Sequence, residues 1–136
     1  MGFQKVNTVE SKSEMQHFVR NLLGDVQAFE YMLQNNWFED DITRIGAEQE
    51  MCLVDNKTFK PACINMEVLA LMGDDKPWCV TELAKFNLEN NLSPREFTGT
   101  CLSDMEAENL HYLSIIQKVL DDFDASIILC GILPTL

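Results

Sequence analysis

Apolar residues recur at helical spacing in the first third of the chain. They occupy one face of a helix at Met15, Phe18, Val19, Leu22, Leu23, Val26, Phe29 and Leu33. The preceding Ser11-Lys12-Ser13-Glu14 has the form of a capping box. The pattern therefore predicts a helix over about residues 13–35, ended by Asn35-Asn36, and residues 1–12 are expected to be a flexible lead-in.

The spacing then changes to that of short strands. Residues 44–54 form an apolar-rich run closed by the turn-forming Asp55-Asn56-Lys57, which predicts one strand. Residues 86–92 alternate well enough for a second strand. Residues 126–133 are almost wholly apolar, which predicts a strand buried on both faces. Because little follows this strand to cover it, we expect that the natural polypeptide continues beyond it.

Two further helices are predicted between these strands. Residues 65–72 favour a short helix stopped by Gly73, followed by a loop over 74–77. A second capping box, Ser103 to Glu106, is expected to open a helix with an apolar face that extends to Phe123. The mixture of helices and strands predicts an α+β fold.

Composition narrows the classes of function. The chain has 136 residues, 46% hydrophobic and 24% charged, with a net charge of −12. Such acidity disfavours nucleic acid and membrane surfaces as partners. No run reaches the ~20 apolar residues of a membrane span, and the N-terminus is too polar for a signal peptide. The five cysteines are odd in number and contain no CxxC, which predicts mostly reduced core thiols and a cytoplasmic location: Cys52, Cys63, Cys79, Cys101 and Cys130.

The first predicted strand carries two carboxylates. Glu48 and Glu50 are two residues apart, so on a strand their side chains leave the same face, with roughly 6.5–7 Å between the Cα atoms. Two carboxylates on a partly apolar face repel each other unless a cation lies between them. A divalent metal satisfies this requirement. An exposed acidic face on an edge strand accounts for the pattern equally well.

A second acidic cluster surrounds the next predicted strand. Asn87, Glu89 and Asn91 share one face, so amides are available to orient Glu89. Glu82 would point the opposite way on an unbroken strand, and it joins the same site only if a turn or bulge intervenes near residues 83–85. Carboxylate and amide oxygens are the ligands that Mg²⁺ or Mn²⁺ prefers. A half-exposed polar strand face is the alternative.

Other candidate groups give weaker signals. Glu108 and His111 have the helical Glu-x-x-His spacing, but a lone pair of this kind favours solvated surface. His17 lies on a polar helix face and is expected at the surface. Arg95 and Lys85 could bind a phosphate or carboxylate, or pair with neighbouring acids. The chain contains neither GxGxxG nor GxxxxGK[ST], so neither a Rossmann site nor a P-loop is indicated.

Taken together, residues 45–55 and 81–89 resemble the N-terminal part of the glutamate–cysteine ligases and related carboxylate–amine ligases. In that family a G-x-E-x-E strand is followed some thirty residues later by T-[DE]-x6-E, and the spacing of Glu82 and Glu89 fits the second motif. The resemblance implies that the matching acids coordinate Mg²⁺ or Mn²⁺ ions that hold ATP. These acids are Glu48, Glu50, Glu82 and Glu89.

The resemblance also implies a fold and an activity. The expected fold is glutamine synthetase-like, a largely antiparallel curved sheet with helices on its outer face, and residues 13–136 would be the incomplete N-terminal portion of one catalytic domain. The implied reaction joins a carboxylate such as glutamate to an amine such as cysteine, through an acyl phosphate made from ATP. Two alternatives remain: a non-catalytic acidic domain that binds a metal or a basic partner, and an inactive fragment that needs further C-terminal sequence.

Overall fold

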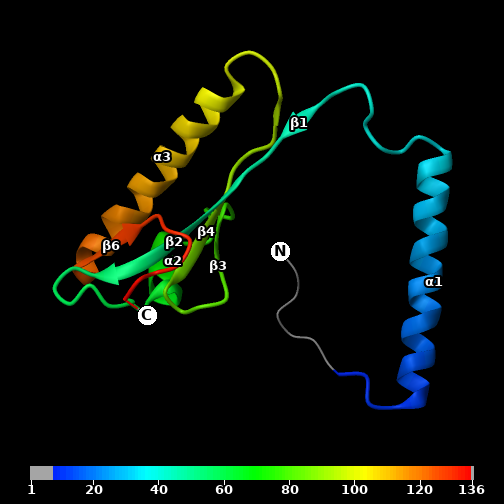
Figure 1. Cartoon of the computed structure of the whole chain (residues 1–136), viewed down its shortest axis with the longest axis horizontal. Helices are drawn as coiled ribbons and strands as arrows, with labels where there is room; N and C mark the ends of the chain where they lie inside the picture. Colours follow the sequence, from blue (N-terminus) through cyan, green and yellow to red (C-terminus); the bar gives the residue numbers. More distant parts are fainter. Residues whose placement is uncertain (1–7, 136) are drawn as a thin grey trace. The chain divides into compact units, whose positions relative to one another are not determined.

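A computed structural model describes residues 8–135 of the chain. It contains two compact units, residues 1–42 and residues 43–136, which we describe separately. None of the helices in the described part is long and apolar enough to cross a membrane. The α+β class predicted from the sequence is confirmed (Figure 1).

The first unit is dominated by one helix, α1 (Lys12–Gln34). The predicted capping box is present: the Ser11 side chain accepts from the Glu14 backbone N–H, and the Glu14 carboxylate accepts from the backbone N–H of Ser11. The predicted apolar stripe is also present, but none of its side chains is buried. Each of the eight remains between 43% and 58% exposed.

The second unit contains a four-stranded antiparallel sheet in the order β3-β4-β2-β6. Its strands are β2 (Glu48–Asp55), β3 (Cys79–Thr81), β4 (Asn87–Asn91) and β6 (Ala125–Ile128). The sequence did not predict β3, which has only three residues. An antiparallel sheet is expected of the glutamine synthetase-like fold, but it also occurs in many other α+β proteins.

Two helices cover one face of this sheet, α2 (Asn65–Met72) and α3 (Cys101–Leu120), and the 3-10 turn η1 (Asp121–Phe123) follows α3. Helix α2 has the predicted bounds and ends at Gly73, whose φ of 81° favours glycine. The main hydrophobic core lies between these helices and the sheet, and its nine buried members are Met51, Leu53, Val68, Met72, Cys79, Leu88, Ile116, Leu120 and Ala125. Alternate residues of β2 and β4 therefore point to the opposite face, which no helix of this unit covers.

Two expectations about strand boundaries are wrong. Residues 44–54 form two strands rather than one, because regular pairing is interrupted at Gly46-Ala47, although the Ala47 carbonyl still accepts from the Leu92 backbone N–H. The first part, β1 (Arg44–Ile45), pairs instead with β5 (Arg95–Glu96), which the sequence did not predict. Strands of two residues, such as β1 and β5, are too short to give a periodic hydrophobic signal in the sequence.

The C-terminal strand also differs from its prediction. Strand β6 ends at Ile128 instead of continuing to residue 133, and it pairs with β2 alone, at the edge of the sheet. It is not buried on both faces, because Ile128 is 36% exposed and Leu129 is 50% exposed. The following residues leave the sheet, and Leu133 packs back with Cys52 and Val54 in a second, smaller cluster.

The second predicted capping box does not form. Helix α3 begins at Cys101 with Thr100 as its N-cap, so Ser103 lies inside the helix and Glu106 is exposed. The hydroxyl of Thr100 donates to the Asp104 carboxylate instead of accepting from a backbone N–H. The periodicity located the helix correctly, whereas the local capping motif misplaced its first turn.

Candidate metal centre

Two neighbouring strands bring Glu50 and Glu89 together. In the antiparallel ladder Glu50 of β2 lies directly opposite Glu89 of β4. Residues paired in this way have Cα atoms about 4.5–5.5 Å apart and side chains on the same face. Both carboxylates are on the face without helices, because their neighbours Met51 and Leu88 point into the core beneath α2 and α3. This sheet register is the first determinant of the site.

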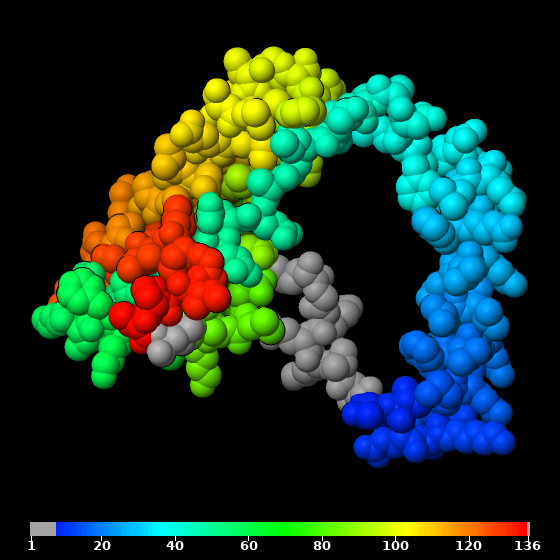
Figure 2. Space-filling model, viewed as in Figure 1, coloured from blue at the N-terminus to red at the C-terminus, as the bar shows by residue number. Residues whose placement is uncertain are grey.

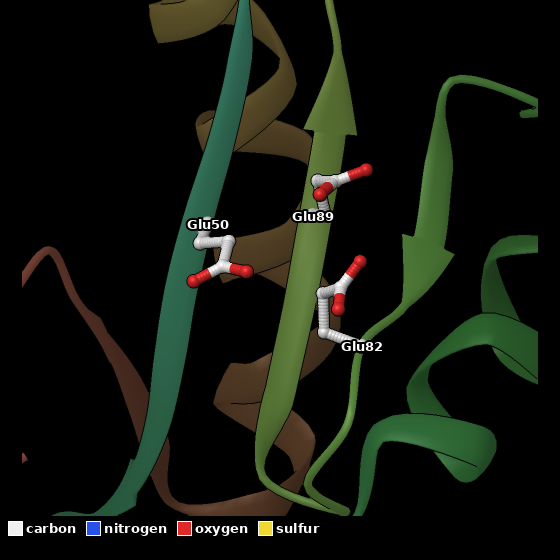
Figure 3. Close-up of side chains that lie close together, drawn as sticks. All are labelled: Glu50, Glu82 and Glu89. Carbon is white, nitrogen blue, oxygen red and sulfur yellow. The ribbon is translucent and has the colours of Figure 1, made fainter. Parts of the chain in front are cut away.

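A turn brings in the third carboxylate. Strand β3 ends at Thr81 and residues 82–86 form the turn into β4. The break that the sequence analysis required between Glu82 and Glu89 is therefore present. It reverses the chain, so the Glu82 side chain lies beside Glu89 instead of on the opposite face (Figure 3).

Asn65, the first residue of α2, fixes this turn. Its side-chain amide donates to the backbone carbonyls of Ala84 and Asn87, each at 3.2 Å, and its backbone N–H donates to the carbonyl of Lys85 at 3.1 Å. Asn65 is 4% exposed, so these bonds are shielded from water. Sequence reasoning missed this residue, since nothing in a short helix indicates that its first side chain holds a turn twenty residues away.

The three carboxylates form a compact group. Each of Glu50, Glu82 and Glu89 offers an oxygen, and these oxygens all lie within 4.8 Å of one another. Figure 3 shows the three side chains on the same side of the sheet, one from β2, one from the turn and one from β4. A cation at their centre could be reached by all three. Since the group contains only hard oxygen donors, its chemistry fits Mg²⁺ or Mn²⁺ better than a metal that prefers sulfur or imidazole.

Glu89 is the most constrained of the three. It is 6% exposed, and Asn91 donates its side-chain amide to the Glu89 Oε1 at 3.1 Å, as the shared strand face predicted. Burial raises the pKa of Glu89, and so do the charge of Glu48 and a hydrogen bond and charge from Glu82; the Asn91 amide opposes this rise. Three ion pairs, Lys57–Asp124, Lys76–Asp75 and Arg95–Glu108, all lie outside this group. The group therefore concentrates negative charge on one face of the sheet.

Glu48 lies outside this compact group. It shares the face of Glu50 and is opposite Asn91 in the ladder, close enough for its charge to act on Glu89. Its side chain borders an open cleft of about 520 Å³ that also includes Gly46, Asn91 and Pro94. The structure thus brings together three of the four acids expected to bind metal, and it places the fourth at the rim of an adjacent cleft.

Two of the weaker candidates, Glu108 and Arg95, bond to each other in the structure. Glu108 is not a solvated acid: its carboxylate accepts from Arg95 at 3.1 Å, from the Ser93 hydroxyl at 2.7 Å and from the Tyr112 hydroxyl at 2.9 Å. Burial opposes ionisation, but these bonds outweigh it and lower the pKa of Glu108. Arg95 therefore pairs with a neighbouring acid, which was one of its two predicted roles. His17 is exposed, as predicted.

Comparison with protein-family models, with curated proteins and with solved structures gave no match. The resemblance to carboxylate–amine ligases consequently rests on the two acidic motifs alone.

Proposed function

We propose that Glu50, Glu82 and Glu89 bind a divalent cation, Mg²⁺ or Mn²⁺, and that this centre serves an ATP-dependent carboxylate–amine ligase of the glutamate–cysteine ligase type. The observation that carries the proposal is the convergence of three carboxylates, one of them buried, on one face of the sheet. Such a group is electrostatically unfavourable when empty. A bound dication would replace the repulsion among the carboxylates with a net attraction to the ion.

The residues of this chain would hold and orient the metal. Glu50 and Glu89 project from adjacent strands, which makes them rigid ligands, whereas Glu82 is on a turn and can adjust to the ion. Asn91 would fix one oxygen of Glu89 and direct the other toward the ion. Glu48 is suited to contact a second ion or a metal-bound phosphate at the rim. When bound, the metal neutralises phosphate charge and positions the transferred phosphoryl group.

The proposed reaction follows from the family resemblance. A substrate carboxylate, such as that of glutamate, attacks the γ-phosphorus of ATP, and ADP departs to leave an acyl phosphate. The nitrogen of an amine such as cysteine then attacks the acyl carbon, and phosphate leaves as the amide forms. The contribution that we assign to this chain is electrostatic, since its carboxylates would hold the metal against the phosphate groups.

Titration calorimetry with Mn²⁺, alone and with a non-hydrolysable ATP analogue, tests the proposal. We expect metal binding that the nucleotide strengthens, and at least a tenfold loss of affinity in E50Q, E82Q and E89Q. The matched control is E106Q, which removes one exposed carboxylate from α3. Failure of the wild-type chain to bind Mn²⁺ would overturn the metal centre itself.

A second candidate function is a metal-binding module without catalysis, which the overall charge of −12 also accommodates. The same calorimetry separates the two candidates. Metal binding that is indifferent to nucleotide favours the module, whereas mutual strengthening of metal and nucleotide favours the ligase. Formation of ADP in the presence of glutamate and an amine would then distinguish turnover from binding alone.

A further inference from the structure

Two cysteines from distant parts of the chain lie together on the sheet face that carries the acids. Cys52 is in the middle of β2 and is 4% exposed. Cys130 follows β6 and packs against the cluster formed by Cys52, Val54 and Leu133. The C-terminal segment, red in Figure 2, covers this part of the sheet. Cys52 and Cys130 therefore pack in one cluster, and neither forms a disulfide.

The backbone explains how the two sulfurs meet. The ladder between β2 and β6 pairs Cys52 with Ile128, so Cys130 is only two residues beyond the position opposite Cys52. Because β6 has ended by then, residues 129–133 are not held by strand pairing and can follow the side-chain packing. Cys130 thus lies on a segment that strand pairing does not prevent from moving toward Cys52, as a disulfide of about 2.05 Å requires.

We propose that Cys52 and Cys130 form a thiol–disulfide exchange site for a low-molecular-weight disulfide such as oxidised glutathione. Cys130, the less buried of the two, reacts first: its thiolate attacks one sulfur of the small disulfide, and one small thiol leaves. The Cys52 sulfur then attacks the Cys130 sulfur of the mixed disulfide and expels the second small thiol. The two cysteines lose two protons and two electrons in all, and the small disulfide is reduced to two thiols.

The surroundings make this pairing selective. Cys79 belongs to the core on the opposite, helix-covered face of the sheet, where burial raises its pKa to about 12. Its thiol is on the other side of the sheet from Cys52 and Cys130, so it cannot pair with either of them in the folded chain. Cys63 is exposed and is expected to form at most a mixed disulfide at the surface. Proximity favours the Cys52–Cys130 bond, because the second attack is intramolecular.

The Cys52–Cys130 disulfide would form next to the carboxylates on this face of the sheet. Cys52 is two residues from Glu50 on the same face of β2, roughly 7 Å away between Cα atoms. A covalent link would fix residues 129–133 beside the carboxylates. It would also close a loop of roughly 80 residues, which lowers the entropy of the unfolded chain.

The test uses the full chain, reduced and then equilibrated with mixtures of reduced and oxidised glutathione. We expect a species about 2 Da lighter than the reduced chain, and peptide mapping should assign its cross-link to Cys52 and Cys130. The melting temperature of this species should rise by about 8 °C or more over that of the reduced chain. Renewed reduction should reverse both changes.

Three cysteine variants test which thiol reacts at each step. C52A should stop the reaction at a glutathione adduct on Cys130, about 305 Da heavier, because the second attack is lost. C130S should abolish the cross-link, whereas C63S, the control at the exposed cysteine, should retain it. The proposal is overturned if wild-type chain in fully oxidised glutathione gives no Cys52–Cys130 cross-link, or if its cysteines pair between molecules instead.

Discussion

Replacing Glu89 by glutamine should stabilise the metal-free chain and weaken its stabilisation by metal. Two unit charges 4.8 Å apart repel by roughly 3.5 kcal/mol at an effective dielectric constant of about 20, and Glu89 faces both Glu50 and Glu82 at no more than this separation. Solvent around the exposed Glu50 screens part of this repulsion. The substitution also weakens the Asn91 hydrogen bond by about 1 kcal/mol. We therefore expect E89Q to raise the free energy of unfolding by about 1–3 kcal/mol in EDTA at pH 8.

The pH dependence of this effect has a definite sign. Since the pKa of Glu89 is raised in the folded chain, the unfolded chain releases its proton first as the pH increases. The contribution of Glu89 to stability is thus full below the unfolded pKa of about 4.3 and is lost as the pH rises through the folded pKa. The advantage of E89Q over wild type should accordingly grow from pH 4 to pH 8 when metal is absent.

Metal should stabilise the wild-type chain more than E89Q. At a Mn²⁺ concentration of one hundred times the wild-type dissociation constant, the wild-type chain gains about 2.7 kcal/mol, whereas E89Q, which binds at least tenfold more weakly, gains about 1.4 kcal/mol or less. Urea unfolding followed by fluorescence gives both values, and a Trp37→Phe background leaves Trp78 to report on the sheet unit. E106Q should resemble wild type throughout. Our account of the site is refuted if E89Q is the less stable chain in EDTA, or if both chains gain equally from Mn²⁺.

Three further substitutions test how the structure is held together. E108Q should lower the free energy of unfolding by about 1.5–3 kcal/mol near pH 7, because it weakens charge-assisted hydrogen bonds. Since the pKa of Glu108 is lowered in the folded chain, this difference should shrink on acidification as the wild type loses the contribution. Urea unfolding of E106Q should show no such loss. Asn65→Ala removes two buried hydrogen bonds to the turn, although the Ala84 carbonyl keeps its bond from the Asn87 backbone N–H, so we expect a loss of about 1–3 kcal/mol in urea unfolding. Mn²⁺ affinity should also weaken through Glu82, and unchanged affinity would show that the turn does not need this support. Gly24→Ala adds a methyl group in open space on α1, so it should increase the helical circular dichroism signal and stabilise the helix by about 0.5–1 kcal/mol. A decrease in this signal would indicate a contact that the structure lacks.

Local pattern was sufficient for most of the secondary structure. The 3.6-residue spacing located α1, and Gly73 marked the end of α2, because a helix needs only its own apolar face and its termini to be recognised. Alternation along β2 likewise placed Glu48 and Glu50 on one face. Local pattern failed for elements that form only with a pairing partner, since β1 and β5 are strands only because they pair with each other. It also misplaced a helix start, because Ser103 resembled the N-cap although Thr100 occupies that position.

The site required more than the sequence could supply. Sequence alone indicated that Glu50 and Glu89 belong to strands, that Glu82 needed a break to join them, and that the chain carries an excess of acidic residues. Tertiary structure decided that Glu50 and Glu89 are directly opposite, that Asn65 secures the turn of Glu82, and that Glu48 remains at the rim. Register and long-range hydrogen bonds depend on how the whole sheet packs against α2 and α3, since a shift by one residue would move every carboxylate to the other face.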